Sequence, residues 1–235
     1  MPVVVDNRGG ASGRIAAAAA AKANPDGHTL FFTYGGVLTT GPGLFRNLPY
    51  DSMRDFAPVA MIAQVPGILV SHPSFLARTV SDILKLAKAK PGALTHGASS
   101  IGSSSHLNME LLKQMAGIDM LLVSYPGDAP ALVAVLGGQV PFAFNNVVVA
   151  LPHIQAGKLR PIAVATTQRV SQLPDVPTVA KAECPATRDC FFTLSSRRRR
   201  LRGSSSKSSM TPWRASSNLR SSGNSLRRWA PYPST

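Results

Sequence analysis

The stretch HGASSIGSSSHLNMELLKQMAG, residues 96–117, joins a loop of small residues to the start of a helix. Seven of the nine residues from Gly97 to Ser105 are serine or glycine. From Leu107 onward, apolar residues recur at the spacing of a helix that buries one face. A short strand is expected at 93–97, just before the loop. The stretch therefore predicts a strand, a Ser/Gly loop and a helix, in that order.

A loop of this composition at a helix start is suited to binding an anion. The first-turn amides have no partner within the helix, and the helix dipole adds partial positive charge there. Glycine allows close approach of the backbone, and serine hydroxyls add donors without bulk. We expect Ser103, Ser104 or Ser105 to cap the helix. An ordinary capped loop would have the same composition, so both interpretations stay open on spacing alone.

Positive charge is concentrated at one end of the chain. The 235 residues carry a net charge of +14, of which residues 1–185 contribute +4 and the last 50 residues +10. The high pI therefore says little about the body of the protein. Cys184 and Cys190 have no His or Cys neighbours at metal-ligand spacing, and the histidines are scattered. We expect neither a metal site nor a cofactor.

Strand and helix patterns alternate along the body. Short apolar strands, including one expected at 2–6 and one at 28–34, are separated by helical segments such as 79–92 and 128–138. This alternation predicts parallel sheets covered by helices, which bind ligands at the carboxyl ends of their strands. Three strand ends are polar: the Ser/Gly loop, TYGG at 33–36, and Asn145-Asn146. Their agreement favours a binding site.

Seven segments between residue 2 and about residue 183 together carry a family resemblance. They are PVVVDNRGGASGRIA, KANPDGHTLFF, NLPYDSMRDFAPVAMIA, AKAKPGALTHGASSIGSSSHLNMELLKQMAGIDM, YPGDAPALVAVLGGQV, LPHIQAGKLRPIAV and LPDVPTVAKA. In this order they resemble the solute receptors of tripartite tricarboxylate transporters, also called Bug-type periplasmic binding proteins. The resemblance implies an α/β, bilobed, type II periplasmic-binding-protein-like fold, with two parallel-sheet lobes and two crossover hinges. It also implies a non-enzymatic receptor that captures a small carboxylated solute and delivers it to membrane permease subunits.

The resemblance predicts how the lobes divide the chain. Lobe one would comprise 1–66 and 166–184, and lobe two 67–165. Family members begin with a signal peptide, a strand and a Pro-Gly loop, whereas this chain begins at what resembles the second strand. We therefore expect an incomplete first lobe and a monomer. The resemblance implies a periplasmic location, but without a signal peptide the chain as written would stay cytoplasmic.

The same resemblance implies the site. In the family, the loop that matches 99–105 helps to hold a ligand carboxylate through hydroxyls, amides and ordered water. Pro126 and Pro141 depart from the basic residue and the aspartate that are usual at these positions. The identity of the solute stays open. The predicted ligand-binding residues are Thr33, Tyr34 and Gly35 from lobe one, and Ser99, Ser100, Gly102, Ser103, Ser104, Ser105 and Asn145 from lobe two.

Two other functions are alternatives. Residues 185–235 are rich in arginine and serine and could form a basic arm that binds nucleic acid. We instead expect a disordered or non-native tail, of the kind a shifted reading frame produces, because this composition cannot bury a core. A serine hydrolase is the weaker alternative, since His106 lies beside several serines. Ile101 replaces the second glycine of a nucleophile elbow, and no orienting acid is evident. We expect His106 to hydrogen-bond locally.

Overall fold

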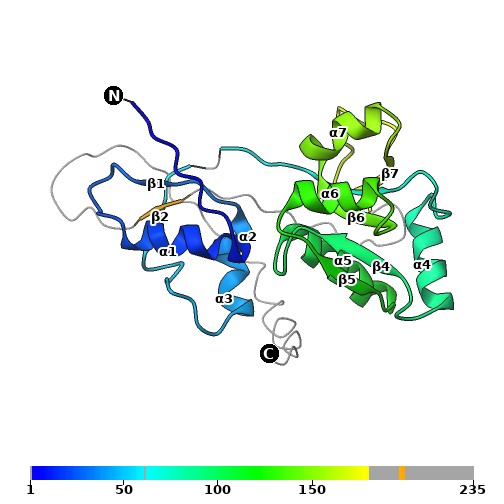
Figure 1. Cartoon of the computed structure of the whole chain (residues 1–235), viewed down its shortest axis with the longest axis horizontal. Coiled ribbons are helices and arrows are strands. Elements are labelled where there is room, and N and C mark those ends of the chain that lie inside the picture. The colour runs from blue at the N-terminus through cyan, green and yellow to red at the C-terminus, as the bar shows by residue number, and fades with distance from the viewer. Residues whose placement is uncertain (1, 61, 180–195, 199–235) are drawn as a thin grey trace.

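The computed structural model describes residues 2–60, 62–179 and 196–198. Its strands form two sheets, and Figure 1 shows these sheets side by side, each with its own helices. We call them the first unit and the second unit. The first unit contains η1 (Ala11–Gly13), α1 (Arg14–Lys22), β1 (Leu30–Phe31), α2 (Gly35–Thr39), α3 (Gly41–Leu44), β2 (Phe56–Pro58) and β8 (Ser196–Arg198).

The second unit is built on a five-stranded sheet with the order β5-β4-β6-β3-β7. Helices and strands alternate along its chain, as the sequence predicts, and the α/β fold class is confirmed. Its elements are β3 (Gly67–Ser71), α4 (Val80–Ala89), β4 (Thr95–Ala98), α5 (Ser104–Ala116), β5 (Leu121–Ser124), α6 (Asp128–Leu136), β6 (Phe142–Asn146), α7 (Val147–Gln155) and β7 (Arg160–Val164).

This sheet is mixed rather than wholly parallel. Strand β4 runs parallel to β5 and β6, but β3 runs antiparallel to both β6 and β7. The first residue of β3, Gly67, pairs with Asn146 at the carboxyl end of β6. The chain thus enters the sheet at the edge where the parallel strands end, and this entry point forces β3 to run in the opposite direction.

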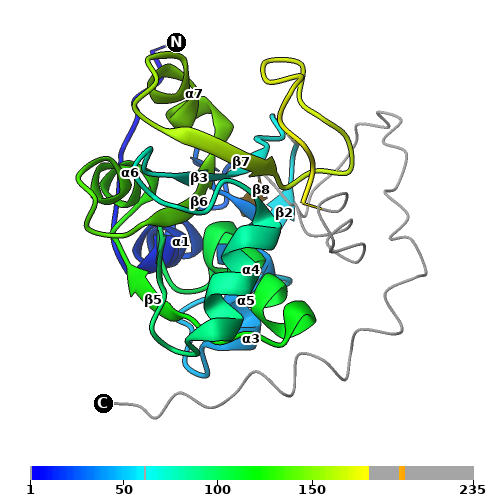
Figure 2. The same ribbon diagram turned by 90° about the vertical axis from the view of Figure 1, so that its right-hand side faces the viewer.

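Two apolar layers fix the second sheet. Successive side chains of a strand point to opposite faces. Leu69, Phe142 and Phe144 accordingly pack in one buried cluster with α4 and α5. Ile68 and Ala143 pack in another cluster with α6 and α7. Figure 2 shows α4 and α5 on one side of the sheet and α7 on the other. The result is a three-layer frame that holds the carboxyl ends of β4, β5 and β6 in place.

The helix caps follow from local side chains. Thr79 caps α4, and it forms a capping box with Asp82. Ser103 caps α5 and accepts a hydrogen bond from the backbone N–H of His106. In the part of the chain that the structure describes, no helix has both the length and the apolar character needed to cross a membrane.

The first unit is smaller than the sequence pattern predicts. The strand expected at 28–34 is limited to Leu30–Phe31. The strand expected at 2–6 does not form, and the side chains of Val3, Val4 and Val5 are exposed. A short segment without a paired neighbour gains no ladder hydrogen bonds, so apolar composition alone does not make it a strand. Among the described residues of this unit, one small cluster around Phe31, Tyr50 and Phe56 forms the core.

The centre of the first sheet comes from the Arg/Ser-rich segment. Strand β8 lies between β1 and β2 and pairs antiparallel with both. This differs from the expectation that residues after about 185 make no stable tertiary contacts. Backbone hydrogen bonds within a sheet do not require apolar side chains, so a segment without hydrophobic periodicity can still pair. The rest of the tail, and with it the alternative of a nucleic-acid-binding arm, lies outside the described residues.

Candidate functional site

Polar residues gather at one edge of the second sheet. Because β4, β5 and β6 run in the same direction, their carboxyl ends meet at this edge. The Ser/Gly loop follows β4, the first turn of α6 follows β5, and Asn145 and Asn146 end β6. Figure 1 shows that this edge faces the first unit. The fold therefore brings together two of the three polar strand ends that the sequence analysis singled out.

The hydroxyl of Ser105 organises the loop. Its Oγ accepts the backbone N–H of Ser99 at 3.0 Å and lies 2.9 Å from Ser99 Oγ and 2.8 Å from Ser103 Oγ. Ser103 Oγ also donates to the carbonyl of Ser100 at 2.7 Å. Ser103 and Ser105 are buried, Ser99 and Ser100 are half-buried, and Ser104 is exposed at the first residue of α5. The two buried serines thus shape the loop, while the other three retain exposed surface.

His106 forms the local hydrogen bond that the sequence predicts. Its Nδ1 accepts the backbone N–H of Gly102 at 3.1 Å, so a neutral ring carries its proton on Nε2. Nε2 lies 3.9 Å from a carboxylate oxygen of Glu110. Burial lowers the pKa of His106 and keeps the ring neutral. With Nδ1 occupied by the backbone, this nitrogen does not serve as the base of a serine nucleophile.

The Ser/Gly loop touches the first unit directly. Thr40 Oγ1 lies 3.0 Å from the carbonyl oxygen of Gly102, and Ser12 Oγ donates to the carbonyl of Ile101 at 3.3 Å. Gly102 has φ +82°, and a Cβ added there would lie 2.6 Å from Cδ1 of Leu44. The positive φ favours glycine, and any larger residue would also require the Leu44 side chain to shift. We call the contact region between the two units the junction.

Tyr34 brings the third polar strand end to the junction. Its hydroxyl donates to the carbonyl of Ser12 at 2.9 Å and is also hydrogen-bonded to Ser100. Burial of the hydroxyl raises the pKa of Tyr34. Thr33 and Gly35 are buried on either side of it, and Thr33 Oγ1 lies 3.4 Å from the Tyr34 carbonyl. Of the three predicted residues in the first unit, Tyr34 is the one with a described contact to the Ser/Gly loop.

Asp128 is a site residue that sequence reasoning missed. A hydroxyl hydrogen bond from Ser99 and the side-chain amide of Asn146 both reach its carboxylate. Asn145 Nδ2 donates to its backbone carbonyl at 2.9 Å, so the predicted residue Asn145 braces the start of α6. Burial raises the pKa of Asp128. The available signal was its position four residues after the end of β5, which places a fourth polar group near the carboxyl ends of the strands.

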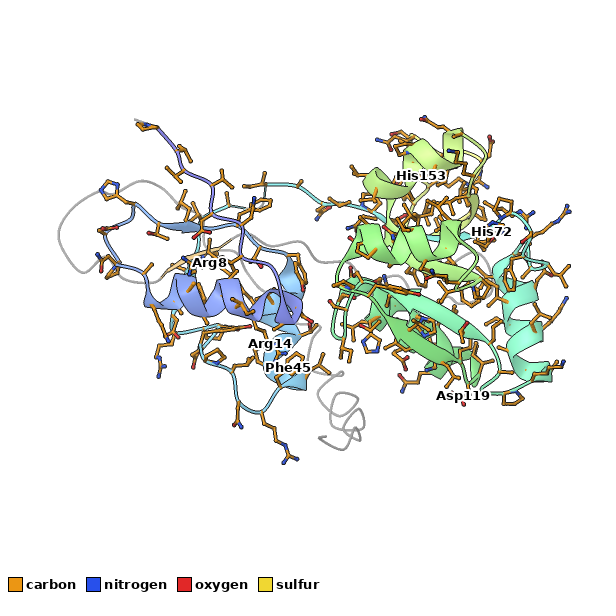
Figure 3. The ribbon with its side chains drawn as sticks, in the orientation of Figure 1. Arg8, Arg14, Phe45, His72, Asp119 and His153 are labelled. Atoms are coloured by element: carbon orange, nitrogen blue, oxygen red, sulfur yellow. The ribbon has the colours of Figure 1, made fainter. Side chains whose placement is uncertain are left out.

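Arg14, at the start of α1, supplies the opposite charge and was also missed. Its guanidinium lies 3.7 Å from the centre of the Phe45 ring, and its Nε donates to the carbonyl of Ala11 at 2.8 Å. Figure 3 shows Arg14 and Phe45 next to each other. The positive charge of Arg14 and the negative charge of Asp128 both act on the Tyr34 hydroxyl. The junction therefore has a cation on its first-unit side and an anion on its second-unit side.

No metal centre is evident in the described part of the chain. Within residues 2–60, 62–179 and 196–198, no three His, Cys, Asp or Glu side chains gather closely enough to hold an ion. Cys184 and Cys190 lie outside this part.

Comparison with known proteins connects this arrangement to a receptor family. The family model described as "Tripartite tricarboxylate transporter family receptor" matches residues 1–192. Protein BugT of Bordetella pertussis is 36% identical over 185 residues, which make up 78% of this chain and 57% of BugT. The chain thus spans little more than half the length of this curated relative.

Two solved structures share the fold and contain a carboxylate. An R. palustris protein solved with adipate is 36% identical, with a TM-score of 0.79, over 83% of this chain and 66% of that chain. A Rhodopseudomonas palustris protein with bound malate is 31% identical, with a TM-score of 0.74, over 81% of this chain and 65% of that chain.

Proposed function

Because this chain belongs to the receptor family of tripartite tricarboxylate transporters, we propose that it binds a small carboxylated solute at the junction and presents it to membrane permease subunits. Members of this family are periplasmic solute receptors, and we assign this chain the same compartment and no catalytic step. The adipate and malate found in two of the similar structures support a carboxylate as the solute class.

The observation that carries this proposal is the Ser/Gly loop at the start of α5. This helix has 13 residues, so its first-turn amides combine with a full helix dipole. Ser104 is exposed at that turn, while the buried hydroxyls of Ser103 and Ser105 hold the loop in shape. A carboxylate placed there would accept hydrogen bonds from amides and hydroxyls without needing a cation beside them.

We propose that the two units are the halves of a closing receptor. Lobe one would comprise 1–66 and 166–184, and lobe two 67–165. Strand β3 enters the second sheet at the junction edge, and Val164 at the end of β7 pairs with Ile68 near the same edge, which supports crossovers at these points. Closure would bring Tyr34, with Thr33 and Gly35 behind it, over a solute on the Ser/Gly loop and exclude water.

Within this scheme the predicted residues take different roles. Ser99, Ser100 and Ser104 would line the solute, Gly102 would let the lobes meet, and Asn145 would brace α6. Ser103 and Ser105 would act through loop shape, since their hydroxyls already bond to neighbours in the loop.

Isothermal titration calorimetry of the 235-residue chain with adipate and malate tests the proposal. We expect binding that is lost in Ser104→Leu, because the added side chain occupies the space in front of the α5 amides. Ser171→Leu makes the same change at an exposed position outside the junction and should leave the affinity unchanged. Unchanged affinity in Ser104→Leu, with an unaltered circular dichroism spectrum, would show that the loop is only a helix cap.

A further inference from the structure

The carboxylate of Asp128 is directed at the loop that we assign to the solute. Asp128 is the first residue of α6, directly after the N-cap residue Gly127. The described partners of the carboxylate are Ser99, from the end of β4, and Asn146, from the end of β6. The side chain therefore extends across the carboxyl edge of the sheet.

Within the described residues, the groups that hydrogen-bond to the Asp128 carboxylate are all neutral. Its hydrogen-bond donors are a hydroxyl and a side-chain amide, and the described ion pairs do not include it. Burial already disfavours the ionised form, as the raised pKa of Asp128 indicates. A second carboxylate bound to the adjacent Ser/Gly loop would place two like charges close together in a partly desolvated region, which is unfavourable.

The opposite side of the junction carries the complementary charge. Arg14 and Asp128 act with opposite sign on the hydroxyl of Tyr34, which lies on the first-unit side of the loop. The guanidinium of Arg14 is held by the Phe45 ring and by the carbonyl of Ala11, rather than by a carboxylate. A solute bound here would meet a cation from one unit and an anion from the other.

We propose that the solute is an amino carboxylate, whose protonated amino group is bound by the Asp128 carboxylate while its carboxylate is bound at the start of α5. This rests on the proposed function. The amino group removes the like-charge conflict, because it gives Asp128 the cation that its described neighbours do not supply. Any second carboxylate of the solute would be directed toward Arg14.

Matched pairs of probes test this proposal in the 235-residue chain. Succinate and L-aspartate, and likewise glutarate and L-glutamate, share a carbon skeleton and both carboxylates, and differ by one ammonium group. At pH 7, calorimetry should show that the amino member of the favoured pair binds roughly 10- to 100-fold more tightly, as expected for a charge-assisted hydrogen bond. Asp128→Asn should abolish this preference by weakening the amino member and, because it removes the like-charge conflict, by tightening the other.

Asp119→Asn is the matched control. Asp119 is exposed just before β5, at the opposite end of this strand from Asp128, and Figure 3 shows it far from Arg14. The variant removes the same charge and should keep the preference for the amino member.

The possible failures are distinguishable. If dicarboxylates bind but the amino members bind no more tightly, the amino-carboxylate assignment is wrong and the proposed function stands. If Asp128→Asn leaves the preference for the amino member intact, the amino-carboxylate assignment is likewise wrong and the proposed function stands. If succinate binding takes up a proton in the wild-type protein but not in Asp128→Asn, Asp128 is neutralised by a proton rather than by an ammonium group. If no probe, adipate and malate included, binds the wild-type chain, the proposed function itself fails.

Discussion

The two units differ in the size of their sheets and cores, and in whether one continuous segment of the chain forms them. The second sheet has five strands of four or five residues, with a buried apolar cluster on each face. The first sheet has three strands of two or three residues, with one small cluster. All elements of the second unit come from one continuous segment, whereas the first sheet closes only when β8 inserts between β1 and β2.

This difference separates two sources of stability. In the second unit, residues of one continuous segment bury apolar area against one another, and hydrophobic stabilisation rises with that area. The first unit depends on backbone pairing across a large sequence separation, which carries a greater entropic cost of loop closure. We expect the second unit to form the stable frame of the site, and the first unit to set how well the junction closes.

Truncation of one aromatic ring in each core should give the largest contrast. Phe142→Ala removes a fully buried ring between the second sheet and α4, and should lower the free energy of unfolding by roughly 3–5 kcal/mol. Phe56→Ala in the first unit should cause a smaller loss, because its cluster can relax around the gap. Urea denaturation followed by circular dichroism measures both losses of unfolding free energy. Equal losses would show that the two cores do not differ in their contribution to stability.

Acid should weaken the second unit through His96. Its ring is fully buried, and burial lowers its pKa to about 4. The unfolded chain therefore binds a proton at a higher pH than the folded chain. This contribution to stability is complete above pH 6.5 and is lost as the pH falls toward 4, by roughly 3 kcal/mol in total.

Urea midpoints between pH 7 and pH 4 measure this effect. His96→Leu should flatten the pH dependence, whereas His28→Gln, at an exposed position in the first unit, should not. If the urea midpoint of His96→Leu depends on pH as steeply as that of the wild-type protein, the acid sensitivity comes from other groups.

Two cap substitutions compare the site loop with an ordinary helix start in the same unit. Thr79→Ala removes the exposed capping box of α4 and should lower the unfolding free energy by about 1 kcal/mol. Ser103→Ala should lower it by about 1–2 kcal/mol, since this hydroxyl also bonds to Ser100 and Ser105 inside the loop. If Ser103→Ala has the smaller effect, the hydroxyl network does not hold the loop.

The smallest expected effect is a gain in stability at the junction. Burial raises the pKa of Asp128, so above its ordinary pKa the folded chain carries a penalty that the unfolded chain lacks. Asp128→Asn should therefore raise the thermal midpoint slightly at pH 7, and the difference should vanish as the pH falls below the ordinary carboxyl range. A lower midpoint at pH 7 would mean that the hydrogen bonds of the carboxylate outweigh its desolvation.

What could be predicted from the sequence was mostly local. Ser103 was one of three candidate caps, because a cap depends on a hydroxyl a few residues from the amides that it serves, and the structure selects it. Ser99 and Asn145 were placed at one edge because parallel strands end together. Whether these residues contact a solute remains a prediction.

Non-local pairing was not predictable in the same way. The insertion of β8 next to Leu30 depends on unpaired strand edges rather than on any pattern within the Arg/Ser-rich segment. The hydrogen bond between Asn146 and Asp128 joins the end of β6 to the start of α6, so neither residue alone could have predicted it. The buried roles of Ser103 and Ser105 likewise depend on loop geometry, which a run of small residues leaves undetermined.

The central position of β8 also has a consequence for the order of folding during synthesis. β1 is translated early, but its partner Arg197 follows only after the whole second unit. At usual elongation rates, on the order of ten to thirty seconds separate the two strands. The second unit can fold within this interval, whereas β1 and β2 wait with open edges. The part of the chain that is made first is therefore completed last, and its exposed edges are the point at which a nascent chain would aggregate.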